Sequence, residues 1–253
     1  MPSVYPGLYK NNSSSTICNF THVPLAQASG ATAVPAVTIN TYNEWLFAEG
    51  AYVQQYNTTT STEAMPTMGT IANNGLNIDT INGAAAKTIE LCLGGNTAAS
   101  KHAYLAGTSA AFFTRATFNI NTLANVTSLY LGFRKVQTFQ ATVPAGYTDY
   151  ATVGVSGAAG LLQIQTQLAS GGNVATSTTN SVTAATNFTV QVNVSSAGVV
   201  TYLIDVLGNG PLIAPSATAA YTFGAQRVVP YILYTTVTSH SEVNLVNWVC
   251  SLS

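Results

Sequence analysis

The residues that could do acid–base chemistry in this sequence are few and scattered. A glycosidase needs two carboxyl groups about 5–10 Å apart. The nearest such pair along the chain is Glu44 and Glu49, which would face opposite sides of a strand because they are an odd number of positions apart. A polysaccharide hydrolase that draws its carboxylates from separate loops is kept as an alternative, but the spacing itself favours a protein that is not an enzyme.

Histidine and cysteine patterns give no metal site. His22, His102 and His240 are widely separated and lack the short spacings of metal ligands. The stretch SHSE (239–242) reads as a polar turn before a strand rather than as part of a catalytic triad. We therefore expect no catalytic residue, no metal ion and no cofactor.

The three cysteines are odd in number and do not occur as C-x-x-C. We predict buried free thiols, although one disulfide stays possible, and the sequence does not decide the state of these residues: Cys18, Cys92 and Cys250.

One short stretch suggests ligand binding. Tyr147 and Tyr150 flank Asp149 in a segment that reads as a loop. Rings at the rim of a loop can stack on a sugar, and an aspartate can contribute to a calcium site. Tyrosine is equally common in strands and at protein interfaces. These three residues are therefore candidates for a glycan-binding rim, which is the alternative to a purely structural role.

The charge content excludes several classes of partner. Only 6% of the residues are charged and the net charge is −1, whereas ordinary soluble domains have about 25% charged residues. Seven Lys and Arg residues cannot form the basic patch that nucleic acid requires, and a membrane surface is equally unfavourable. Open sheet edges without charge are prone to pair with other chains. Either much of the surface faces other subunits, or Asn, Thr, Ser and Gln keep the chain soluble without charge, and composition favours neither.

The elements that must position these residues read as strands. Apolar and polar residues alternate in 88–93, 128–136, 161–168 and 188–194. Residues 112–120 are a further strand candidate, 150–156 is small and apolar, and apolar runs cover 199–206, 227–237 and 242–252. Residues 42–56 could be one strand or a short helix, and GGNVATSTTN (171–180) reads as a polar loop. About ten to twelve strands at this spacing predict an all-β antiparallel sandwich or jelly roll over residues 42–253.

Residues 1–41 differ from the rest. Four prolines interrupt any regular ladder, yet apolar anchors occur throughout: Tyr5, Leu8, Tyr9, Ile17 and Phe20. We predict an extended N-terminal arm that contacts a partner, with packing along its own domain as the alternative. The opening MPSVYPGLYK has no apolar core of a signal peptide, so the chain is expected to be made in a cytoplasm.

Several segments taken in order resemble a known group of proteins. SLYLGFRKVQ, YTDYATVGVSG, LQIQTQL, FTVQVNVSSAGVVTYLIDV, AAYTFGAQRVVPYILY and EVNLVNWVCSL are similar to virion structural proteins of tailed bacteriophages that have a concanavalin- or laminin-G-like sandwich. The likeness covers about residues 110–252 and concerns strand patterning. It assigns no catalytic residue.

This resemblance implies a capsid decoration or cement protein on the outer capsid surface. Its expected location is the virion, after synthesis in the host cytoplasm, and its expected partners are the major capsid protein and further copies of itself, as a trimer rather than a dimer. The residues of the arm would make the capsid contact. A carbohydrate-binding adhesin or tail-fibre module is the alternative function.

Overall fold

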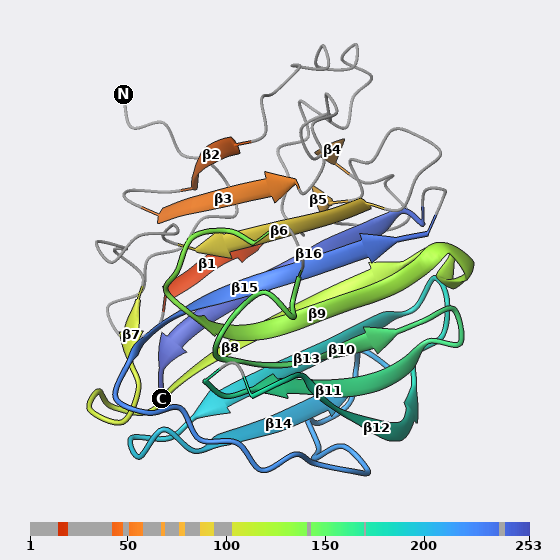
Figure 1. Cartoon of the computed structure of the whole chain (residues 1–253). Helices are drawn as coiled ribbons and strands as arrows, with labels where there is room; N and C mark the ends of the chain where they lie inside the picture. The colour runs from red at the N-terminus through yellow and green to blue at the C-terminus, as the bar shows by residue number, and fades with distance from the viewer. Residues whose placement is uncertain are drawn as a thin grey trace.

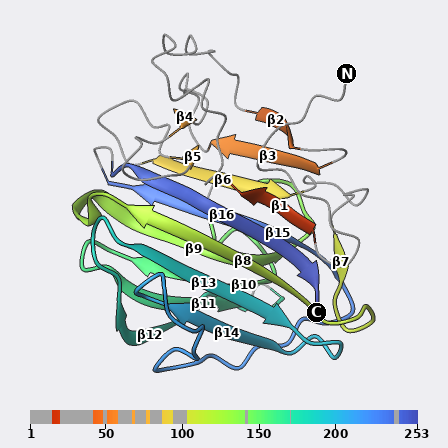
Figure 2. The ribbon, with the colours of Figure 1, turned by 180° about the vertical axis from the view of Figure 1, so that it is seen from behind.

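The computed structural model describes residues 15–19, 42–47, 51–57, 67–68, 76–78, 87–93, 103–140, 143–169, 171–237 and 241–253. Before residue 103, side chains are described only for 77–78 and 88–92. Two antiparallel sheets lie face to face (Figures 1 and 2). This arrangement confirms the antiparallel β-sandwich predicted from the sequence.

The smaller sheet has seven strands: β1 (Ser15–Asn19), β4 (Thr67–Met68), β5 (Leu76–Asn77), β8 (Phe112–Ile120), β13 (Asn187–Val194), β14 (Val200–Asp205) and β16 (Val243–Leu252). The larger sheet has nine strands: β2 (Tyr42–Phe47), β3 (Ala51–Asn57), β6 (Lys87–Leu93), β7 (Tyr104–Leu105), β9 (Val126–Lys135), β10 (Tyr150–Ser156), β11 (Leu161–Gln167), β12 (Val174–Ser181) and β15 (Arg227–Thr236). A short 3-10 helix, η1, covers Leu123–Asn125. No helix in the described part of the chain is long and apolar enough to cross a membrane.

The core fills the space between the two sheets because alternate residues of each strand point inward. The inner face of β13 contributes four side chains, Phe188, Val190, Val192 and Val194, all buried, as the alternation predicts. Rings from the two sheets meet in the core, where the centroids of Phe112 and Phe133 lie 5.0 Å apart in an edge-on arrangement. Each such side chain contributes roughly 1.5–3 kcal/mol through burial.

Two predictions about individual strands need correction or completion. The polar segment GGNVATSTTN is not only a loop, because Val174–Ser181 forms β12 at the end of the nine-stranded sheet. An edge strand needs few apolar residues, so its composition resembles that of a loop. The ambiguous segment near residue 45 forms two strands, β2 and β3, that pair with each other.

The predicted N-terminal arm lies mostly outside the described residues, including its anchors Tyr5, Leu8, Tyr9 and Phe20. The part that is described, β1, pairs antiparallel with β16 of its own chain. Ile17 lies where the register of this pairing shifts, between Thr16 and Cys18. Over this short segment, the alternative of packing along its own domain is therefore the one observed.

Candidate functional site

The outer face of the nine-stranded sheet, which points away from the seven-stranded sheet, carries most of the chemically interesting residues. Cys92, Tyr130, Val229, Tyr231 and Leu233 form a second apolar cluster there, separate from the main core. Val136, Phe139 and Val143 pack against this cluster from the segment that joins β9 to β10. That segment, residues 136–149, therefore folds back over its own sheet.

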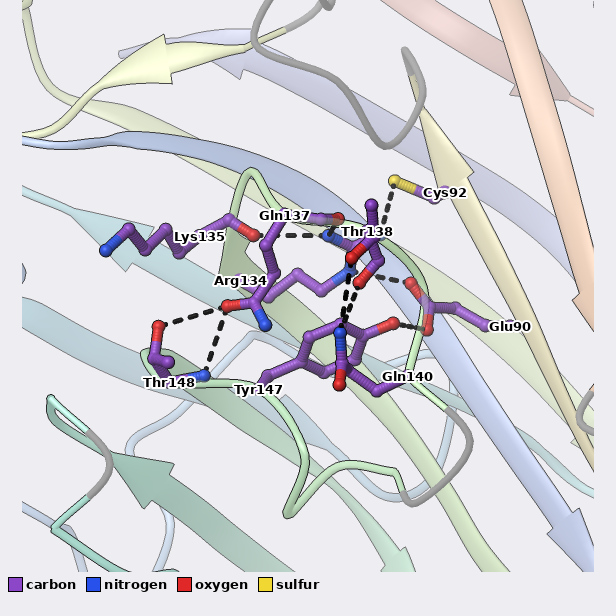
Figure 3. Close-up of polar contacts among 9 residues, drawn as sticks. All are labelled: Glu90, Cys92, Arg134, Lys135, Gln137, Thr138, Gln140, Tyr147 and Thr148. Atoms are coloured by element: carbon purple, nitrogen blue, oxygen red, sulfur yellow. Dashed lines mark hydrogen bonds and ion pairs between the residues drawn. The ribbon is translucent and has the colours of Figure 1, made fainter.

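A buried ion pair lies beneath this segment (Figure 3). Arg134 Nε donates to Glu90 Oε1 at 2.7 Å, and the two side chains are 0% and 1% exposed. The hydroxyl of Tyr147 donates to the other oxygen of the same carboxylate, Oε2. Glu90 thus has a hydrogen-bond donor at each of its oxygens.

The guanidinium of Arg134 has further partners on every side. Nη1 donates to the carbonyl oxygens of Lys135 and Gln137 at 3.1 and 3.2 Å, and Nη2 lies 3.5 Å from Cys92 Sγ. Its Cζ is 4.5 Å from the centroid of the Tyr147 ring, close enough for a cation–π contact. The rings of Phe139 and Tyr231 lie 5.3 and 5.8 Å from the same atom.

The electrostatics of this cluster follow from its burial. Desolvation raises the pKa of the Glu90 carboxyl above its ordinary value, and the charge of Arg134 and the Tyr147 hydrogen bond offset this in part. Burial by itself would lower the pKa of Arg134, but the Glu90 charge outweighs it and raises that pKa. The pKa of the Tyr147 hydroxyl is raised by burial and by the neighbouring carboxylate.

A group sealed from solvent cannot reach a substrate, so the geometry of the Glu90–Arg134–Tyr147 cluster is that of an internal cross-link. It fastens the 136–149 segment to β6 and β9. Gln137 strengthens the closure, since its Oε1 accepts from both the backbone N–H and the hydroxyl of Thr148, at 3.1 and 3.0 Å.

The glycan rim expected from the sequence is not a surface feature. Tyr147 and Tyr150 are 0% exposed, so neither ring is available for stacking on a sugar at the surface. Asp149 is also buried; its oxygens accept from Ala169 N and Thr148 Oγ1, and Lys135 Nζ lies 3.7 Å away. The three residues lie together as predicted, but in the interior.

The other candidates are only partly described. Glu44 lies on β2, where its register partner is Gln54, while Glu49 and the three histidines fall outside the described residues. Cys92 and Cys250 are buried and form no disulfide, which confirms the prediction for those two; the side chain of Cys18 is not described. Among the described residues, no group of His, Cys, Asp and Glu is placed to hold a metal ion.

A polar network follows the same outer face from the buried Tyr130 toward exposed residues at β12. The hydroxyl of Tyr130 donates to Gln163 Oε1 at 3.0 Å, and Gln165 Nε2 donates to Tyr130 Oη at 2.8 Å and to Gln163 Oε1 at 2.9 Å. Gln163 Nε2 approaches Ser177 Oγ at 3.4 Å, and Asn173 Nδ2 approaches Gln165 Oε1 at 3.4 Å. We name these five residues the glutamine row.

Gly154 makes the glutamine row possible. It lies between Tyr130 and Gln163 in the register of β9, β10 and β11, so no side chain separates the phenol from the two amides. A Cβ at this position would lie 1.9 Å from Leu129 O, which only glycine avoids. Gln163 and Gln165 are half-buried, whereas Asn173 and Ser177 are exposed. The row therefore presents fixed, neutral donors and acceptors to solvent.

Sequence reasoning missed both the ion pair and the row. Arg134 and Glu90 each occupy a strand that is otherwise mostly apolar, and a lone charge in such a strand requires a partner. This pattern could have predicted that Arg134 and Glu90 form a pair. Nothing in the sequence shows that Tyr130 reaches Gln163 across Gly154.

Comparison with known proteins gives a likeness of fold. No protein family matches the sequence, and no curated protein matches it. The VIP36 exoplasmic/lumenal domain in its Ca²⁺/Man3GlcNAc-bound form is similar with a TM-score of 0.52 and 6% identity, over 79% of this chain and 83% of that chain. Its Ca²⁺-bound form gives a TM-score of 0.51 at the same identity and coverage. At this identity the likeness establishes a lectin-type, concanavalin-like sandwich and nothing finer.

Proposed function

We propose that this chain is a non-catalytic carbohydrate-binding protein and that the glutamine row is its ligand face. The observation that carries the proposal is the row itself, in which amide and hydroxyl groups are held in fixed orientation by one another. Neutral sugars present hydroxyl groups that both donate and accept, so fixed neutral amides and hydroxyls are complementary to them.

The charge distribution and the fold support the same function. The row contains no ionisable carboxylate or amine, so it favours a neutral ligand over a phosphate or an acidic polymer. Within the described part of the chain, no pair of carboxylates faces the row to cleave a glycosidic bond, and Glu90 is sealed beneath the 136–149 segment. The similar fold of VIP36, whose structure holds Man3GlcNAc, is compatible with binding a glycan without hydrolysing it.

A glycan array followed by calorimetry tests this proposal. We expect saturable binding of at least one neutral glycan. Gln165→Ala should weaken it about tenfold or more, because the substitution removes hydrogen bonds that contribute about 0.5–1.5 kcal/mol each. Gln191→Ala is the matched control. Gln191 is also a half-buried glutamine, but it lies on the seven-stranded sheet, where it donates to Asn193 of the same strand. No binding on the array, or equal affinity of Gln165→Ala and the parent, would overturn the proposal.

A second candidate function is a structural role on the outer surface of a phage capsid, with the major capsid protein as partner. The resemblance of residues 110–252 to virion proteins supports it, as does the scarcity of charge: residues 150–226 contain a single charged residue, Asp205. Contacts made by such a surface are little affected by salt.

Co-sedimentation with empty capsids separates the two candidates. Deletion of residues 1–14 removes Tyr5, Leu8 and Tyr9 from the predicted arm and leaves β1 in place. Loss of capsid binding by this variant would favour the structural role. Full occupancy by the truncated chain would exclude Tyr5, Leu8 and Tyr9 as the contact, and failure of the parent chain to co-sediment would exclude the role itself.

A further inference from the structure

Among the described residues, one flank of the sandwich carries no exposed charge. β12 and β14 end the two sheets on the same side of the molecule (Figures 1 and 2). The chain from Tyr150 to Gln226, which builds this flank, contains only Asp205 as a charged residue. Asp205 is itself buried, and its carboxylate accepts from the backbone N–H groups of Leu207, Gly208 and Gly210.

The same flank carries most of the large apolar side chains that are exposed in the described residues. Six of nine come from it: Leu161, Leu168, Val174, Val199, Leu207 and Ile213. Val174 and Leu168 are 57% and 52% exposed. Both line an open hollow of about 390 Å³ together with Ala220, Tyr221 and Thr222.

The two sheet edges on this flank differ in how much of each is covered by other residues. The connection between β14 and β15 covers part of both. Ile213 pairs with Ile204 of β14, and Ser216 exchanges hydrogen bonds with Thr179 and Asn180 of β12. The first half of β12, residues 174–177, pairs with β11 on one side only, and no described strand lies on its other side.

Natural sheets protect such an edge with lysine, proline or a bulge. Residues 174–177 (VATS) contain neither lysine nor proline, and the register shift between β11 and β12 lies beyond them. From this unprotected edge we propose that residues 174–177 bind the same segment of a second copy of this chain. The two strands pair antiparallel about a two-fold axis and join two nine-stranded sheets into one.

Three features make a second copy the fitting partner. A two-fold contact brings each residue close to its own copy, which is unfavourable for charged residues and harmless for uncharged ones. The exposed Leu168 and Val174 become covered beside the joined strands. The hollow that they line leaves room for an apolar side chain of the second copy.

The geometry also fixes the centre of the pairing. Rotation about a two-fold axis perpendicular to a sheet keeps each side chain on its own face. Residues that pair across the axis must therefore point to the same face, so one residue lies opposite its own copy at the axis. Within this segment that position is Ala175 or Thr176. An even-numbered assembly follows, in place of the trimer expected from the sequence resemblance. The inference does not depend on the proposed carbohydrate binding.

Sedimentation velocity of the full chain tests the proposal. We expect a dimer whose dissociation constant changes little between about 0.1 M and 1 M NaCl, over which the Debye length falls from about 10 Å to 3 Å. Ala175→Lys places like charges side by side at the axis and should weaken the dimer at least about tenfold. Val174→Lys should act in the same direction. Both positions are exposed, and far-UV circular dichroism verifies that the variants are folded.

Thr127→Lys is the matched control, because it adds the same charge at an exposed position on β9, an interior strand of the sheet. It should leave the dimer unchanged. A chain that is monomeric at all concentrations would overturn the proposal. The proposal would also be overturned if the Ala175→Lys and Val174→Lys variants are folded and assemble as readily as the parent.

Discussion

Arg134 and Glu90 form an ion pair across an intervening strand. Arg134 lies on β9 and Glu90 on β6, with β15 between them in the sheet, yet Arg134 Nε is 2.7 Å from Glu90 Oε1. In the register, the row between the two residues holds Gly132 on β9 and Tyr231 on β15, and Arg134 Cζ lies 5.8 Å from the centroid of the Tyr231 ring. One charged pair thereby links β6 and β9 to the segment that covers them.

Removal of either partner of this pair should destabilise the fold strongly. Arg134→Met leaves a buried carboxylate, and Glu90→Gln leaves a buried guanidinium without its counter-charge. Each should lower the free energy of unfolding by about 3–5 kcal/mol. The double variant should cost less than the sum of the two by about 0.5–3 kcal/mol, since it leaves no unpaired charge.

Urea unfolding of the four proteins measures this cycle. Arg115→Met is the control, because Arg115 is half-buried on the outer face of the other sheet and should cost no more than about 0.5 kcal/mol. Additive effects of the two substitutions, or single losses as small as the control, would show that the pair does not act as a unit.

Alkaline pH should unfold the protein through its buried tyrosines. Burial raises the pKa of seven tyrosines whose side chains the structure describes: Tyr104, Tyr130, Tyr147, Tyr150, Tyr202, Tyr221 and Tyr231. Below the ordinary pKa of about 10, both the folded and the unfolded chain keep these protons. Above it the unfolded chain releases them and the folded chain does not, so stability falls as pH rises.

The expected fall is steep because each such group contributes up to about 1.4 kcal/mol per pH unit. Seven groups would exhaust a stability of about 5–15 kcal/mol within roughly one to two units above pH 10. Tyrosinate absorbance and far-UV circular dichroism, recorded on the same pH series, should therefore change together. Reversible ionisation of most tyrosines near pH 10 with an unchanged dichroism spectrum would contradict this account.

The sequence was sufficient for the strands whose two faces differ in polarity. β13 and β11 were located from alternation alone, because the sandwich core imposes a period of two on any strand that covers it. β12 was missed since an edge strand rich in Thr and Ser has the composition of a loop. The burial of Tyr147 was not accessible either, because it depends on Glu90, which is 57 positions away in the sequence.

Asn244 should be replaceable by an apolar residue with a gain in stability. It is 0% exposed, and neither Nδ2 nor Oδ1 has a hydrogen-bond partner among the described residues. It lies in a row of four asparagines across the seven-stranded sheet, between Asn77 and Asn119, with Asn187 next to Asn119. Asn244→Leu should raise the free energy of unfolding by about 1–3 kcal/mol, because an unsatisfied buried amide is removed.

Thermal and urea unfolding check this gain. Asn193→Leu is the control: Asn193 accepts from Gln191 Nε2 at 2.6 Å, so its replacement breaks a hydrogen bond and should not stabilise. A loss of stability in Asn244→Leu would instead indicate that ordered water satisfies this amide.

Gly154 and Gly132 should both be intolerant of a side chain. A Cβ at Gly154 would lie 1.9 Å from Leu129 O, and one at Gly132 would lie 2.0 Å from Ala151 O. Both clashes are with backbone of the adjoining strand, which cannot move aside without breaking the ladder between β9 and β10. We expect Gly154→Ala and Gly132→Ala each to cost about 4 kcal/mol or more, at the upper end for single substitutions.

The matched control for the two glycines is Gly224→Ala, since nothing lies within 4 Å of a Cβ at that position; it should be nearly neutral. Gly154 separates Tyr130 from Gln163, so a residual folded fraction of Gly154→Ala should also lose glycan affinity. Equal stability of Gly154→Ala and Gly224→Ala would show that the strands can separate at this point, and the rigid glutamine row would then lack its physical basis.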